Sequence, residues 1–247
     1  MTSASARFAS GEGPGAITPD GCAVDLYALL LAGVAEAAMI TSVTPPGGTV
    51  LELGAGAGRV TQRLIDSGIA VVAVDESREM LDRITGAETV HSTIEMLQLG
   101  RRFDVVVLGS HLINVPDEEA VLALLRACAR HVGPGGQVLV ERRNPRWFDV
   151  VEETTVEQDG VVYAVTVIER PAPAVVTATI TYTVDDRRWS QTFTTRRVDD
   201  DLLVDLLAGA DLALNGFLDT DRTWVDAYPR RSVASPAGER RQPDLHR

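Results

Sequence analysis

The feature that most constrains this chain is a glycine-rich stretch at residues 51–60, which read LELGAGAGRV. A short apolar segment leads into Gly54, Gly56 and Gly58, and a helical pattern begins at Arg59. Glycine loops between a strand and a helix are typical of ligand sites in open α/β sheets. The stretch therefore predicts an α/β fold with a small anion or a nucleotide-like ligand at this loop.

The segments that follow alternate between short apolar strands and helical patterns. Strands are predicted at 49–53, 70–75, 88–92, 103–110 and 137–142, and helices at 59–68, 79–84 and 118–132. Asp117 stands where an N-cap residue belongs, directly before the last of these helices. Strands separated by helices form a mostly parallel, doubly wound, Rossmann-like sheet.

The pattern changes after about residue 148. Between Val176 and Val184, apolar residues alternate with threonines, which is typical of a half-buried antiparallel strand. Turns are predicted at Asp185-Asp186 and at residues 158–160, which read QDG. We expect a small antiparallel β insert after strand five, followed by a capped helix and a last strand.

The chain is accordingly divided into four parts. A mobile N-terminus is predicted for 1–20 and a disordered tail for 229–247, because both are rich in small or polar residues and proline. The core comprises 21–148 and 197–228. The insert at 149–196 is expected to act as a substrate lid or a dimer contact.

Composition restricts the partners. The net charge of −12 argues against nucleic acid and anionic membranes, which attract basic surfaces. No apolar run has the length of a membrane span, and no signal-peptide core is visible at the start. Cys22 and Cys128 lie in unrelated contexts and suggest no metal site. We expect a cytoplasmic protein with a small-molecule or short-peptide substrate and no metal. Whether it forms a homodimer stays open at this point.

The glycine spacing narrows the choice of ligand. Dinucleotide sites use G-x-G-x-x-G, whereas this loop reads G-x-G-x-G and no Gly-Lys-Ser/Thr follows. Glu52 precedes the loop and would repel a pyrophosphate. Asp75 ends the next strand, where a carboxylate can accept hydrogen bonds from ribose hydroxyls. A ligand with an amino-acid end, a ribose and no phosphate fits, and S-adenosylmethionine has this composition.

Four segments together carry a family resemblance: ELGAGAGR, VDES followed two residues later by ML, RRFDVVVL, and HVGPGGQVLV. Over roughly residues 25 to 145 they resemble the class I S-adenosylmethionine-dependent methyltransferases. The insert after strand five is similar to that of small-molecule N-methyltransferases, including glycine and amino-sugar types.

The resemblance implies a set of cofactor contacts. The methionyl end would be lined by Glu52, Gly54, Ala55 and Gly56, with Ser110 beside it. Gly58 would let the helix approach, and Arg59 would reach the carboxylate. The ribose and adenine would be contacted by Asp75, Glu76, Ser77, Met80, Thr93 and Ile94. The family often has an aspartate after strand three, where this chain has Thr93. Tyr27, on a predicted N-terminal helix, resembles a tyrosine that closes the site in many relatives.

Candidate catalytic and substrate residues follow the later strands. His111 and Asn114 come just after strand four, where open α/β sheets place their ligands. Glu141, Arg142 and Arg143 end strand five, and from this region we select Arg143 and Trp147 as substrate contacts. The catalytic candidates are His111, Asn114 and Tyr27. An ordinary turn histidine, turn asparagine or buried tyrosine is the alternative interpretation of each.

Methyl transfer from a sulfonium is an in-line displacement, so an enzyme mainly aligns the nucleophile and excludes water. We hypothesise N-methylation of a small metabolite, a natural product or a peptide N-terminus, because an amine only has to arrive unprotonated. One alternative is O-methylation with His111 as general base. A second is a non-catalytic S-adenosylmethionine-binding protein. NAD-linked oxidoreduction is a third, and the loop spacing opposes it.

Overall fold

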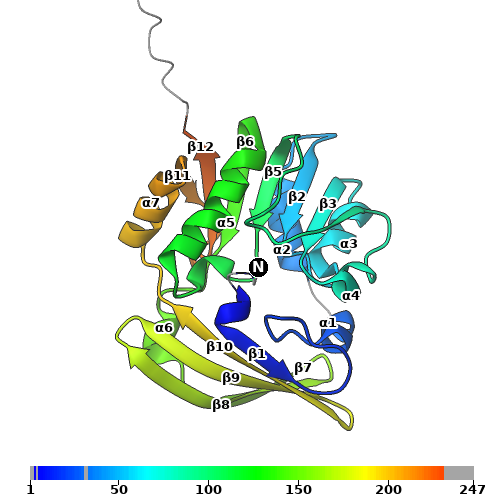
Figure 1. The fold of residues 1–247 in the computed structure, drawn as a ribbon, viewed down its shortest axis with the longest axis vertical. Helices are drawn as coiled ribbons and strands as arrows, with labels where there is room; N and C mark the ends of the chain where they lie inside the picture. Colours follow the sequence, from blue (N-terminus) through cyan, green and yellow to red (C-terminus); the bar gives the residue numbers. More distant parts are fainter. Residues whose placement is uncertain (1–2, 4, 31–32, 231–247) are drawn as a thin grey trace, which may run out of the picture.

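The computed structural model describes residues 3, 5–30 and 33–230, and it contains two β-sheets (Figure 1). The larger sheet has seven strands in the order β11-β12-β6-β5-β2-β3-β4. Their bounds are β2 (Thr49–Leu53), β3 (Ala70–Asp75), β4 (Glu88–His91), β5 (Phe103–Leu108), β6 (Val132–Glu141), β11 (Leu212–Phe217) and β12 (Trp224–Pro229). Strands β2 to β6 run parallel, and β12 is antiparallel to both β6 and β11.

Helices cover both faces of this sheet. They are α2 (Val34–Val43), α3 (Arg59–Asp66), α4 (Arg78–Leu81), the 3₁₀ helix η2 (Leu112–Asn114), α5 (Glu118–His131) and α7 (Asp200–Gly209). Val50 packs in the cluster with α2 and α3, whereas its neighbour Leu51 packs in the cluster with α5 and α7. Because successive strand residues point to opposite faces, an apolar residue at nearly every position is what a doubly covered sheet requires. None of the helices in the described part of the chain is both long and apolar enough to cross a membrane.

The smaller sheet is antiparallel, with the order β1-β10-β9-β8-β7. Its strands are β1 (Ala9–Glu12), β7 (Thr154–Gln158), β8 (Val161–Ala172), β9 (Val175–Val184) and β10 (Arg187–Arg196). In Figure 1 it lies across the lower end of the larger sheet, with α1 (Val24–Leu29) and α6 (Trp147–Val150) nearby. Its inner face therefore lies opposite the ends of the parallel strands.

The prediction of a mobile segment at 1–20 is wrong for much of that range. After the 3₁₀ helix η1 (Ser5–Arg7), residues 9–12 pair with the edge of β10 as strand β1. A Cβ on Gly11 would lie only 2.0 Å from the carbonyl oxygen of Gly21, so this glycine permits a close backbone approach. Composition suggested flexibility, whereas these small residues serve close packing.

The C-terminal part also differs from the prediction. Only one strand was expected after α7, but β12 follows β11 and lies between β11 and β6. Strand β6 begins at Val132, five residues earlier than predicted, with an irregularity opposite Phe103 and Val105. Of the tail predicted as disordered, residues 231–247 lie outside the described residues, and Pro229 ends β12.

Candidate functional site

A cavity of about 420 Å³ lies between the carboxyl ends of the parallel strands and the smaller sheet. Gly54, Asp75, Ser110 and Glu141, at the ends of β2, β3, β5 and β6, all line it. From the smaller sheet, the lining residues are Ala9, Ile180, Tyr182, Gln191, Phe193, Thr194 and Thr195. The cavity therefore occupies the position where open α/β sheets bind ligands.

The three glycines of the loop have different physical roles. All adopt left-handed backbone, with φ values of 74° at Gly54, 55° at Gly56 and 82° at Gly58. A Cβ on Gly58 would lie 2.6 Å from Cγ1 of Ile84, so this glycine lets the start of α3 approach the segment after α4. A Cβ on Gly56 would meet nothing within 4 Å. Gly54 and Gly56 line the cavity and leave its floor open to a ligand.

Asp75 joins this loop to the end of β3. One carboxylate oxygen accepts a hydrogen bond from the Gly56 N–H and the other from the Ser77 N–H, both at 2.8 Å. Burial raises the pKa of Asp75 above its ordinary value, although these backbone hydrogen bonds act in the opposite direction. Glu76 also lines the cavity and accepts a 2.6 Å hydrogen bond from the Ser3 hydroxyl. Two carboxylates are thus available to a diol at this point.

Glu52 does not line the cavity, unlike the sequence prediction. Its side chain is buried and accepts a 2.6 Å hydrogen bond from Thr61 on α3, and burial raises its pKa to about 7. Ala55, Gly58 and Ser77 also lie outside the lining. Ser77 instead caps α4 by accepting the Met80 N–H. Glu52, Gly58 and Ser77 thus contact α3, α4 or the segment after α4, in place of the cavity.

On the β3–β4 side, Met80, Thr93 and Ile94 all line the cavity, and Met80 and Ile94 are buried. This provides an apolar wall suited to a flat ring. Arg59, at the start of α3, also lines the cavity. Its Nε is buried and has no hydrogen-bond partner among the described residues. Arg59 is therefore positioned to bind an anionic group of a ligand.

His111 lines the cavity, and its backbone is left-handed like that of Ser110. Its Nδ1 lies 3.7 Å from Oε1 of Glu141, while Oε2 of Glu141 accepts the Ser110 N–H at 2.7 Å. Burial, together with the nearby charge of Arg143, lowers the pKa of His111 to about 3. The imidazole is therefore neutral at physiological pH and a weak base.

Asn114 lines the cavity, but its amide is already engaged on both sides. Its Nδ2 donates to the Arg196 carbonyl at 2.9 Å, and its Oδ1 accepts the Arg143 N–H at 2.7 Å. The side chain is buried. Its geometry supports a structural role that joins η2 to β10 and fixes the backbone at Arg143, in place of the catalytic role predicted from sequence.

Arg143 lines the cavity, whereas Trp147 does not. The Arg143 guanidinium lies 4.4 Å from the Trp147 ring centroid and 5.3 Å from that of Phe193. Trp147 therefore lies outside the lining and contacts the lining residue Arg143 through a cation–π interaction. Tyr27 of α1 also lines the cavity, and burial raises the pKa of its hydroxyl well above the ordinary value.

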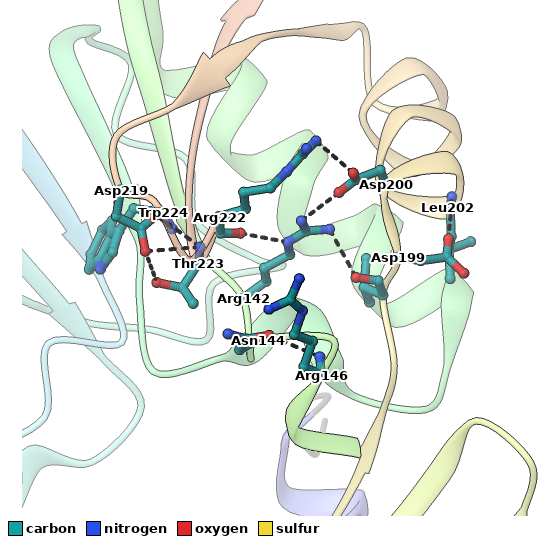
Figure 2. A network of polar contacts seen from close by, with 11 residues as sticks. Arg142, Asn144, Arg146, Asp199, Asp200, Leu202, Asp219, Arg222, Thr223 and Trp224 are labelled. Atoms are coloured by element: carbon teal, nitrogen blue, oxygen red, sulfur yellow. Dashed lines mark hydrogen bonds and ion pairs between the residues drawn. The ribbon is translucent and has the colours of Figure 1, made fainter. Parts of the chain in front are cut away.

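Several lining residues were not selected from the sequence. Among them are Asp20, Glu36, Glu141, Tyr182 and Gln191. Glu141 could have been selected, because Glu141 and Arg143 lie on the same side of an extended chain and Arg142 lies on the other. The structure bears this alternation out: the Arg142 side chain is buried and bonds to the carbonyls of Arg222 and Val198 and to Asp200 (Figure 2).

Fold and site together define a class of protein. A doubly wound sheet, a G-x-G-x-G loop and an acid at the end of the next strand form a pocket for a nucleoside ligand without phosphate. The cavity suits S-adenosylmethionine: its lining holds the unpartnered Nε of Arg59, the carboxylates of Asp75 and Glu76, and the apolar side chain of Met80. Within the described residues, no group of three or more His, Cys, Asp or Glu could hold a metal ion.

Comparison with known proteins agrees with this class. Residues 50–136 match the family described as "Methyltransferase domain". The cypemycin N-terminal methyltransferase of a Streptomyces species is 36% identical over 135 residues, which cover 51% of this chain and 55% of that protein. The ubiquinone biosynthesis O-methyltransferase of Proteus mirabilis is 30% identical over 118 residues, covering 42% of this chain and 47% of that protein.

Among solved structures, the glycopeptide N-methyltransferase MtfA in complex with S-adenosylmethionine has a TM-score of 0.56 and 25% identity. The match covers 81% of this chain and 96% of that one. Residues 50–136 therefore form a methyltransferase domain, and the chain is similar in sequence and fold to S-adenosylmethionine-dependent methyltransferases. It spans about half the length of the curated relatives that it matches.

Proposed function

We propose that the protein transfers the methyl group of S-adenosylmethionine to an amine, either of a small natural product or at the N-terminus of a peptide. The observation that carries this proposal is the charge of the cavity. Among the described residues that line it, the carboxylates are Asp20, Glu36, Asp75, Glu76, Glu95 and Glu141, and the guanidinium groups are Arg59 and Arg143. A lining with this excess of negative charge favours a cationic ligand such as an ammonium ion.

Two further points support an amine over a hydroxyl acceptor. O-methylation was predicted with His111 as its base, and burial and the charge of Arg143 make His111 a weak base. The N-methyltransferases acting on cypemycin and on a glycopeptide are among the similar proteins. O-methylation remains the second candidate, because the ubiquinone biosynthesis O-methyltransferases also match the chain.

Different residues of the cavity would bind the methyl donor and the acceptor. Arg59, Asp75 and Glu76 would bind the donor. The sulfonium of the donor supplies the methyl group, and the electron pair of the broken C–S bond stays on sulfur. Tyr182, Gln191 and Phe193 of the smaller sheet would position the acceptor, because they line the opposite wall. This arrangement favours the insert as a substrate wall that excludes water.

The test is a product assay with labelled S-adenosylmethionine and three acceptors: trialanine amide, glucosamine and catechol. We expect label on the nitrogen of at least one amine and none on catechol. Methylation of catechol alone would replace the proposal by O-methylation. Binding of S-adenosylmethionine in calorimetry without any labelled product would favour a non-catalytic binder.

A further inference from the structure

Two consecutive non-glycine residues at the end of β5 have an unusual backbone. Ser110 and His111 have φ values of 55° and 56°, in the left-handed region that side chains seldom adopt. Such conformations persist where the surroundings enforce them, and they are concentrated at functional sites. Here the result is that the Ser110 N–H holds one oxygen of Glu141 at 2.7 Å and His111 lies beside the other.

Between His111 and Glu141 there is a gap that a ligand atom could bridge. Nδ1 of His111 is 3.7 Å from Oε1 of Glu141, which is too long for a hydrogen bond. Nδ1 is buried and has no hydrogen-bond partner among the described residues. Buried polar atoms in folded proteins are nearly always paired. This pair, both members of which line the cavity, therefore indicates a position for a donor that belongs to a ligand.

The groups around Glu141 define which donor fits. Arg59, Arg143, His111 and Tyr182 line the same cavity, and Glu36 of α2 contributes a second carboxylate. The Arg143 guanidinium is stacked against Trp147 and Phe193. His111 is neutral, since burial and Arg143 lower its pKa to about 3. A neutral imidazole beside a carboxylate is suited to an N–H donor that carries positive charge.

We propose that Glu141 and His111 hold the acceptor amine as its ammonium ion, and that Glu141 takes up the proton that the amine must lose. In this step an N–H bond breaks, its proton moves to Oε1, and its electron pair stays on the nitrogen as the nucleophile. The carboxylic acid so formed returns its proton to solvent after turnover. This inference rests on the proposed function, whose substrate class it defines, and it makes Glu141 a catalytic residue.

The test uses Glu141→Gln, which keeps an oxygen for the Ser110 N–H but removes the charge and the proton acceptor. With the amine that the wild type methylates, we expect kcat/KM to fall by about 100-fold or more, the range of a lost general base. The Kd of S-adenosylhomocysteine should stay within about twofold, which also reports correct folding. Glu119→Gln is the matched control, since it removes an exposed carboxylate of α5 that does not line the cavity. A similar loss in both variants would overturn the assignment.

A binding measurement separates this inference from the proposed function. Trialanine amide and glucosamine, and their N-acetylated counterparts, are titrated into the wild-type and Glu141→Gln complexes with S-adenosylhomocysteine. We expect at least one free amine to bind the wild type at least tenfold more tightly than its acetylated form, and to lose this preference in Glu141→Gln. If that preference appears but no amine is methylated, only the proposed function fails. If neither amine is preferred, or if the preference survives in Glu141→Gln, the inference is overturned.

Discussion

Asp75 and Glu52 end neighbouring strands, yet they face different surroundings. Asp75 lines the cavity and accepts hydrogen bonds from the loop, whereas Glu52 is buried against Thr61. From the sequence both were expected to touch the ligand, because the ends of adjacent parallel strands lie side by side. The two side chains have different directions, so in our proposal Asp75 contacts the donor and Glu52 does not.

Asp75→Asn should weaken binding of S-adenosylhomocysteine by roughly 10- to 100-fold, corresponding to about 1–3 kcal/mol for a lost partner of a buried polar group. The amide of asparagine has one oxygen that accepts hydrogen bonds, whereas both oxygens of Asp75 accept them from the Gly56 and Ser77 N–H groups and, in our proposal, from a ribose. Calorimetry measures the change in Kd. Asp82→Asn is the control, because Asp82 is an exposed acid nearby in the chain. Equal affinity of the Asp75 variant and the wild type would contradict the ribose role.

At the scale of elements, the end of β6 distributes three charged residues by alternation. Glu141 and Arg143 line the cavity, while Arg142 enters a network with the loop before β12 and the start of α7. Figure 2 shows its guanidinium between Arg222 and Asp200. The ring of Phe217 lies 5.1 Å from the Arg142 Cζ. The end of β6 therefore contributes residues to the cavity and also bonds to the C-terminal elements.

Arg142→Met should lower the free energy of unfolding by about 3 kcal/mol, since it leaves buried carbonyl groups without a donor. Urea denaturation followed by circular dichroism measures this. Arg146→Met provides the comparison, because Arg146 is exposed and lies only four residues further on. If both variants lost the same small amount, the Arg142 network would contribute little to stability.

Elements with a strong local pattern were predictable, and those defined by distant pairing were not. Strand β3 was predicted with the bounds that it has, and Asp117 caps α5 as expected. Strand β1 has a glycine- and serine-containing sequence whose order depends on pairing with β10, far along the chain. In the site, the loop and Asp75 lie close in sequence, whereas the contact of Glu141 with Ser110 spans 31 residues and has no local signal.

At the scale of the whole molecule, the N-terminal segment connects the two sheets around the cavity. Strand β1 pairs with β10 of the smaller sheet, and Arg7 forms a 2.9 Å ion pair with Asp117 at the start of α5. Phe8 packs against the core of the larger sheet and also lines the cavity. A ligand in the cavity would contact this segment as well as the glycine loop, so the segment is expected to respond to binding.

We therefore expect S-adenosylhomocysteine to slow amide hydrogen exchange in β1. If β1 must detach before the ligand can leave, then at a ligand concentration 100 times Kd its opening becomes about 100-fold rarer, or about 2.7 kcal/mol less favourable. Exchange followed by mass spectrometry measures this. Strand β7 is the internal control, because it forms the other edge of the same sheet and contributes no residue to the cavity lining. Slower exchange in residues 54–58 with unchanged exchange in β1 would show that the N-terminal segment opens independently of the ligand.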